Sequence, residues 1–252
     1  MSFAVAAEAY DRFMGRYSIP LGPLFAEFAG VAPGQRILDV GCGPGALTEH
    51  LVSRVGVGSV SAVDPSESFV AALAERQPTL DVRRAAAEEL PFADESFDTV
   101  LAQLVVHFMT DPIAGLREMA RVARPGAVVA ASVWDHGGGH GPLSVYWDVV
   151  RELEPDVYDE SRLAGAREGH LAELFEAAGL QDVEEVSLAV DVRHETFEEW
   201  WEPYTLGVAP AGAYVAGLDD DRREQLRARC AEVVQAPFTL TARAWSVRAS
   251  AV

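Results

Sequence analysis

The feature that most constrains this chain is a short apolar run followed at once by closely spaced glycines. Residues 36–45 read Arg-Ile-Leu-Asp-Val-Gly-Cys-Gly-Pro-Gly, and Ile37, Leu38 and Val40 predict a strand buried on both faces. The glycines let the backbone turn sharply and approach a ligand closely. Because the apolar residues after the turn have helical spacing, the stretch predicts the opening of a nucleotide-binding βαβ unit, with the ligand at the carboxyl end of the strand.

The composition of the turn bears on which nucleotide it binds. A dinucleotide fingerprint needs G-x-G-x-x-G, whereas this turn is G-x-G-x-G with Ala46 where the third glycine of that pattern belongs. Asp39, two residues before the first glycine, would also receive an anionic pyrophosphate poorly. A sulfonium nucleoside has no phosphate and carries a positive charge, so both departures favour it.

Several stretches along the chain resemble, in order, the motifs of class I S-adenosylmethionine-dependent methyltransferases, in particular the small-molecule, methyltransferase type 11-like subgroup. These stretches are Arg36–Gly45, Asp64, Leu90–Asp98 and Arg124–Gly126. The resemblance implies an α/β, Rossmann-like fold with a seven-stranded, mostly parallel sheet and an antiparallel last strand. It also implies S-adenosylmethionine as cofactor and S-adenosylhomocysteine as product.

Length and patterning predict one α/β domain with an inserted segment, because 252 residues at 49% hydrophobic can bury a full core. We expect residues 1–35 to form a helical lid segment. Residues 36–193 and 237–252 would form the Rossmann-like, cofactor-binding domain. Residues 194–236 are too long for a plain hairpin loop between the last two strands, and we interpret them as an inserted helical cap.

The net charge of −19 indicates which partners to expect. A surface this acidic disfavours nucleic acid and anionic membranes and favours a cationic cofactor. Cys42 and Cys230 are far apart in sequence and suggest neither a disulfide framework nor a metal site, which fits a reducing cytoplasm. No run is long enough to span a bilayer. We therefore predict a cytoplasmic protein that acts on a small-molecule methyl acceptor, as a monomer or a homodimer.

Two stretches are expected to hold the nucleoside. Asp64 ends the second predicted strand, where a carboxylate can accept hydrogen bonds from both hydroxyls of a ribose. Alternatively, Asp64 and Ser66 cap the next helix, and the two roles are compatible. Residues 85–98 resemble the family stretch in which an aspartate holds the adenine amino group, but Ala86 occupies the aspartate position. Main-chain amides near Ala87 and the side chain of Glu88 would then recognise the adenine.

The segment before the first strand is aromatic and basic around residues 10–17. It either covers the edge of the sheet or folds over the cofactor, as the same segment does in similar enzymes, and Arg16 is then expected to pair with the methionine carboxylate. The full expected cofactor set is Tyr10, Arg16, Asp39, Gly41, Cys42, Gly43, Asp64, Pro65, Ser66, Ala86, Ala87, Glu88, Gln103 and Leu104.

Residues 103–108 follow a predicted strand, at the edge of the sheet that faces the ligand. His107 is the expected general base, with a buried core histidine as the alternative. The expected acceptor-binding residues are Tyr17, His136, Trp200, Trp201 and Tyr204, although the aromatic cluster also suits a role in fastening the cap. Residues 136–141 hold two histidines, but their glycines favour a mobile loop over a helix, and we predict no metal.

The sequence therefore predicts in-line transfer of a methyl group from S-adenosylmethionine to a small apolar or aromatic metabolite. Two other classes stay open. A nicotinamide-dependent oxidoreductase would share the layout of strand, glycine turn and acid. A catalytically silent protein that binds S-adenosylmethionine is suggested by Ala86 and by the absence of an obvious base.

Overall fold

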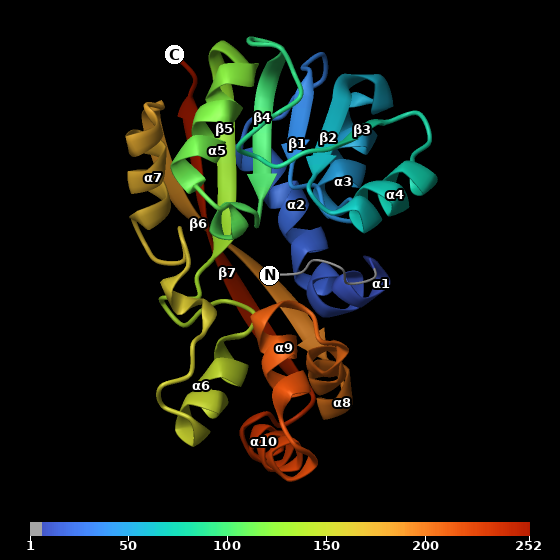
Figure 1. The fold of residues 1–252 in the computed structure, drawn as a ribbon, viewed down its shortest axis with the longest axis vertical. Coiled ribbons are helices and arrows are strands. Elements are labelled where there is room, and N and C mark those ends of the chain that lie inside the picture. Colours follow the sequence, from blue (N-terminus) through green and yellow to red (C-terminus); the bar gives the residue numbers. More distant parts are fainter. Residues whose placement is uncertain (1–6) are drawn as a thin grey trace.

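A computed structural model describes residues 7–252, and within them the strands form one seven-stranded sheet in the order β3-β2-β1-β4-β5-β7-β6 (Figure 1). The strands are β1 (Ile37–Val40), β2 (Val60–Asp64), β3 (Asp81–Arg84), β4 (Phe97–Gln103), β5 (Ala123–Trp134), β6 (Gln181–His194) and β7 (Phe238–Ser250). Strands β1 to β5 pair in parallel, and β7 runs antiparallel to both β5 and β6. The predicted fold class is confirmed.

Helices cover both faces of the parallel part of the sheet. The longer ones are α2 (Arg16–Phe28), α3 (Ala46–Val55), α4 (Glu67–Arg76), α5 (Pro112–Val122), α6 (Ser144–Leu153), α7 (His170–Ala178), α9 (Ala209–Gly217) and α10 (Asp220–Val233). The shorter turns are α1 (Ala7–Tyr10), η1 (Asp11–Gly15), η2 (Val57–Ser59), η3 (Val106–Phe108), η4 (Glu160–Arg162), α8 (Phe197–Trp201) and η5 (Glu202–Leu206). One core lies under α2, α3 and α4, and another under α5 and α7. Every residue of β1 is buried, as a central parallel strand requires.

A second group of helices surrounds the far ends of β6 and β7, below the parallel strands in Figure 1. Residues 194–236 contain α8, η5, α9 and α10, in the segment interpreted as an inserted cap. The structure adds α6, which precedes β6 in sequence and packs against α10. We retain the division into lid, domain and cap as a proposal, in which the group of helices draws on two separate segments of the chain.

The described part of the expected lid segment is helical, while residues 1–6 lie outside the described residues. The turn η1 is a π-helix, a rare geometry that is frequent at functional sites. Its side chains Phe13 and Met14 are buried in the same core as the residues of α6 and α9. Within residues 7–252, the helices are too short or too polar to cross a bilayer.

Candidate functional site

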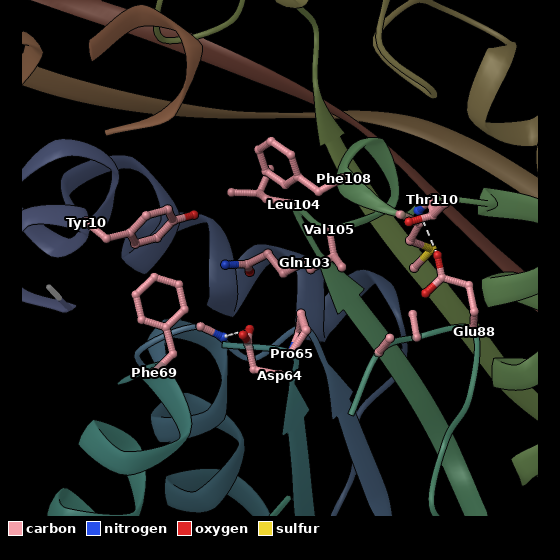
Figure 2. A pocket seen from close by; sticks show the side chains of 15 residues that line it. Tyr10, Asp64, Pro65, Phe69, Glu88, Gln103, Leu104, Val105, Phe108 and Thr110 are labelled. Atoms are coloured by element: carbon pink, nitrogen blue, oxygen red, sulfur yellow. Dashed lines mark hydrogen bonds between the residues drawn. The ribbon is translucent and has the colours of Figure 1, made fainter. Parts of the chain in front are cut away.

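A cavity of about 340 Å³ opens at the carboxyl ends of β1, β2 and β4 (Figure 2). This is the edge where an open α/β sheet binds its ligand. Most of the expected cofactor residues line it, namely Tyr10, Gly41, Gly43, Asp64, Pro65, Ala86, Ala87, Glu88, Gln103 and Leu104. Phe69, Val105 and Phe108 also contribute, and sequence reasoning did not assign them to the site.

The glycine turn after β1 forms the floor of this cavity. The backbones of Gly41 and Gly43 are left-handed, with φ of 70° and 54°, a conformation that favours glycine. A Cβ atom on Gly41 would lie 2.4 Å from the Cγ2 atom of Val105, whereas one on Gly43 would meet no atom within 4 Å. The turn therefore packs tightly on one side and leaves open space for a ligand on the other.

Asp64 is fixed at the tip of β2 by two main-chain amides. Its Oδ2 atom accepts a hydrogen bond from the Gly43 N–H (2.9 Å), and its Oδ1 atom accepts one from the Ser66 N–H (2.8 Å). Burial raises the pKa of Asp64, and the two hydrogen bonds oppose that rise. Each carboxylate oxygen keeps a further lone pair, so the group suits two ribose hydroxyls. The Ser66 hydroxyl accepts from the Phe69 N–H and caps α4, as the alternative interpretation expected.

Asp39 lies beneath the turn and does not line the cavity. Its carboxylate is 1% exposed and accepts a hydrogen bond of 2.6 Å from the Thr48 hydroxyl. Burial raises the pKa of Asp39 to about 7; the Thr48 hydrogen bond lowers it, and the charge of Asp64 raises it further. Cys42 also faces away from the cavity, into the core beneath α2 and α3. Neither side chain is placed to contact the nucleoside, in contrast to expectation.

The wall at the expected adenine end is built on Ala86, Ala87 and Glu88. The Oε1 atom of Glu88 accepts hydrogen bonds from the N–H groups of Thr110 (2.7 Å) and Asp111 (3.2 Å), the first of which is drawn in Figure 2. The Glu88 carboxylate thus holds the loop after β4 against the cavity. This leaves the main chain at Ala86 and Ala87 as the better candidate for adenine recognition.

Gln103 and Leu104, at the end of β4, give the cavity a buried acceptor oxygen and a strained backbone. The Gln103 amide nitrogen donates to the Ser18 carbonyl (3.0 Å), while its Oε1 atom is buried with no hydrogen-bond partner among the described residues. A buried carbonyl oxygen without a donor suits an ammonium group. Leu104 has φ of 63°, and a branched residue adopts this left-handed backbone rarely and at a cost in strain. Such strain is concentrated at ligand sites.

Arg16 does not reach the cavity, so its expected contact with the methionine carboxylate has no support. Its Nη1 atom lies 2.9 Å from the Nδ1 atom of His194 and 3.6 Å from a carboxylate oxygen of Glu199. Tyr17 is bound to the other side of the same imidazole, with its hydroxyl 3.0 Å from Nε2. These side chains join the lid segment to the start of the inserted cap. Tyr10 is the lid residue that lines the cavity.

The expected general base, His107, and the expected acceptor-binding residues other than Tyr17 divide into two groups. His107 and His136 line a second, smaller cavity, and their rings are 6.3 Å apart. Trp200, Trp201 and Tyr204 line neither this cavity nor the first, and all three are buried in the core between the lid and the cap. The structure therefore favours the alternative in which they fasten the cap. Burial lowers the pKa of His107 to about 3, with a smaller contribution from His136.

The loop after β5 is held in place by the side chain of Asp135. Asp135 accepts hydrogen bonds from the Gly138 N–H (2.8 Å) and from the imidazole of His140 (2.9 Å). Over residues 7–252, no group of three or more His, Cys, Asp or Glu side chains is close enough to hold a metal ion.

The sheet order, with a glycine turn after β1 and an acid at the tip of β2, defines the fold of class I S-adenosylmethionine-dependent methyltransferases. Residues 38–131 match the family described as "Methyltransferase domain", and this stretch is a class I methyltransferase domain of the type 11 kind. S-adenosylmethionine is the cofactor that the family implies.

Several related sequences and solved structures are also methyltransferases by name. An uncharacterized methyltransferase of Mycobacterium tuberculosis is 38% identical over 135 residues, which cover 54% of this chain and 52% of that protein. The demethylmenaquinone methyltransferase of Renibacterium salmoninarum is 32% identical over 160 residues, or 63% of this chain and 66% of that one. Phosphoethanolamine N-methyltransferase 2 of Haemonchus contortus, solved with S-adenosyl-L-methionine, shares the fold with a TM-score of 0.59 at 18% identity, over 97% of this chain and 56% of that one. This chain spans about half the length of the first curated relatives that it matches.

Proposed function

We propose that this protein transfers a methyl group from S-adenosylmethionine to a small-molecule acceptor. The observation that carries the proposal is the fixed Asp64 carboxylate at the rim of a cavity whose floor is the open side of Gly43. The acidic balance of the chain adds support, because a net charge of −19 attracts a cationic cofactor and repels nucleic acid.

Each end of the cofactor has a candidate partner in the cavity. Asp64 would accept hydrogen bonds from the ribose hydroxyls, and the main chain at Ala86 and Ala87 would bind the adenine. The unpartnered Oε1 atom of Gln103 would accept a hydrogen bond from the ammonium of the methionine moiety. When bound, the sulfonium supplies a methyl group to a nucleophile in line with a neutral thioether leaving group.

The contribution of the protein is then mainly to align the reactants and exclude water, which supplies about 7–11 kcal/mol in the best intramolecular models. An apolar or aromatic acceptor is favoured because Phe108, Leu104 and the lid side chain Tyr10 form the side of the cavity that continues toward the cap. The relative from Renibacterium salmoninarum, by its name, methylates demethylmenaquinone, which is consistent with such an acceptor.

A calorimetric comparison of three nucleotides tests the cofactor. We expect S-adenosylmethionine and S-adenosylhomocysteine to bind and NADH to give no heat. Asp64→Asn should weaken S-adenosylhomocysteine by about tenfold or more, because it removes charge-assisted hydrogen bonds. The matched control is Asp156→Asn, at an exposed position far in sequence from the site. Tighter binding of NADH, or unchanged affinity in Asp64→Asn, would contradict the proposal.

Release of S-adenosylhomocysteine in the presence of a panel of small acceptors tests the transfer itself. We expect at least one acceptor to increase the release above the rate of the protein alone. Tight binding of the cofactor without turnover on any acceptor would instead identify a catalytically silent binding protein.

A further inference from the structure

The second cavity continues the first toward the inserted cap. The two cavities share Tyr10, Leu104 and Phe108 as wall residues, which are labelled in Figure 2. The smaller one, here called the chamber, has a volume of about 30 Å³, enough for one or two water molecules. The lid residues Phe13 and Met14 close it from one side. A group that reacts beside the cofactor can therefore enter the chamber from the first cavity.

Three residues of the chamber each bury a polar atom that has no hydrogen-bond partner among the described residues. These atoms are the Nδ1 of His107, the indole Nε1 of Trp134 and the carboxylate Oε2 of Glu160. The three side chains come from η3, the end of β5 and η4, and they are 8%, 2% and 3% exposed. Folded proteins leave few buried polar atoms unpaired, so three around one small chamber indicate a ligand group that pairs with them.

The hydrogen-bonding capacity of the three atoms points to one kind of ligand group. The Trp134 indole only donates, a Glu160 carboxylate only accepts, and a neutral His107 can do either according to its tautomer. A hydroxyl group donates one hydrogen bond and accepts another, so it satisfies Trp134 and Glu160 together. An ammonium cannot accept from the indole, and a carboxylate would be repelled by Glu160.

We propose that the chamber receives the hydroxyl of the methyl acceptor and that the Oε2 atom of Glu160 takes its proton. This inference rests on the proposed methyltransferase function. The new bond joins the acceptor oxygen to the methyl carbon, and the bond from that carbon to sulfur breaks with its electron pair left on sulfur. The hydroxyl proton passes to Glu160, and the products are a methyl ether and a neutral thioether.

The acid–base properties of the chamber agree with this assignment. Burial raises the pKa of Glu160 to about 7 and outweighs the lowering effects of its own main-chain N–H and of the nearby Trp147 indole, whose Nε1 atom also makes no hydrogen bond among the described residues. A base of this pKa is well matched to neutral pH. Burial lowers the pKa of His107 to about 3 and that of His136 to about 4, so both imidazoles are neutral and weakly basic. We therefore assign to His107 a hydrogen-bonding role in place of the general base expected from sequence.

The other ionisable groups near Glu160 do not titrate in the same range. Asp159 precedes it in η4 and is paired with Arg151 of α6, and several opposing effects leave the pKa of Asp159 lowered. Tyr146 of α6 and Tyr204 of η5 also interact with Glu160, and burial raises the pKa of both phenols. Asp39, beneath the first cavity, also has its pKa raised to about 7, so a change in ligand preference around neutral pH reports on Glu160 when it is absent from Glu160→Gln.

Fluorine NMR with three small ring compounds tests the inference on the full-length protein saturated with S-adenosylhomocysteine. The probes are 4-fluorophenol, its methyl ether 4-fluoroanisole and 4-fluorobenzoate. We expect the phenol to bind about tenfold more tightly than either of the others, as a hydrogen bond to a charged acceptor provides. The preference should decrease as the pH falls below about 7 and Glu160 becomes protonated.

Two variants and one control identify the groups responsible. Glu160→Gln, which keeps the size of the side chain, should remove the pH dependence of the preference. Trp134→Phe removes the donor and should weaken 4-fluorophenol with little effect on 4-fluoroanisole. Glu176→Gln, at an exposed position on α7, should behave like the parent protein.

The results separate the two proposals. If the parent protein fails to bind S-adenosylhomocysteine, the proposed function is overturned. Normal binding of that nucleotide with equal affinities for the three probes, or a pH-dependent preference that persists in Glu160→Gln, would overturn the assignment of the chamber and of Glu160 alone.

Discussion

The buried carboxyl group of Asp39 is expected to make the stability of this protein depend on pH. Burial raises its pKa from 3.8 to about 7, and at 1% exposure the side chain has almost no solvent to screen it. Because the pKa is higher in the folded state, the folded protein holds an extra proton between about pH 4 and pH 7. The stability that this proton contributes is complete below the unfolded pKa and is lost as the pH rises through about 7. The difference between the folded and unfolded pKa values corresponds to a change of about 4 kcal/mol in the free energy of unfolding.

Asp39→Asn isolates this effect. The amide has the same shape and keeps an oxygen that can accept the Thr48 hydrogen bond, but it cannot ionise. We expect its free energy of unfolding, relative to the parent protein, to rise by about 3 kcal/mol between about pH 5 and pH 8. Other titrating groups are common to both proteins and cancel in the difference.

Urea denaturation of the two proteins at about pH 5, 6, 7 and 8 measures the difference, with Asp156→Asn as the control at an exposed position. A difference that stays constant within about 0.5 kcal/mol over this range would refute the reasoning. Above about pH 7, where Asp39 is ionised, the same substitution removes a negative charge from beneath the glycine turn of the cofactor cavity. We therefore expect it to weaken S-adenosylmethionine more than S-adenosylhomocysteine, which lacks the positive sulfur.

Three further substitutions test the glycine turn and the aromatic core separately. Gly41→Ala should destabilise the protein by about 2 kcal/mol or more, because the new Cβ would lie 2.4 Å from Val105 in a left-handed backbone. Gly43→Ala should lower the free energy of unfolding by only about 1 kcal/mol. Equal losses of stability in urea denaturation of the two variants would contradict this account. Trp200→Ala should lower the free energy of unfolding by about 3–5 kcal/mol and leave the calorimetric affinity for S-adenosylhomocysteine within about twofold. A large loss of that affinity would show that Trp200 acts at the cofactor site.

The strand and turn that open the sheet could be predicted from local signals, whereas the number of strands and the antiparallel last strand followed from the family resemblance. Buried parallel strands are continuous apolar runs, and the turn at Gly41 and Gly43 follows from backbone freedom alone. The acid at the end of β2 was placed correctly at the cavity because the carboxyl ends of parallel strands share one edge. Such inferences need only the order of elements and not the packing of individual side chains.

The expectations that the structure does not support concern side chains whose direction is set by packing between distant segments. Arg16 lies at the start of a helix that turns toward His194, about 180 positions away in the sequence, and this contact has no local signature. The sequence alone does not distinguish a ligand-binding Trp200 from one buried in the core, because residues from distant segments also pack against it. Glu160 was missed because, in a chain with 39 acidic residues, one more acid in a non-periodic stretch is typical of a solvated loop.

The position of β7 affects the order in which the protein can be built. This strand is the last in sequence, yet it lies between β5 and β6 and pairs with both. Until residues 238–250 leave the ribosome, β6 has no neighbour, and β5 is open along one edge. Exposed strand edges are where chains pair wrongly with one another. The nascent protein therefore carries two strands with unprotected edges for the whole time in which α8, α9 and α10 are synthesised, so aggregation during synthesis is a hazard that its topology creates.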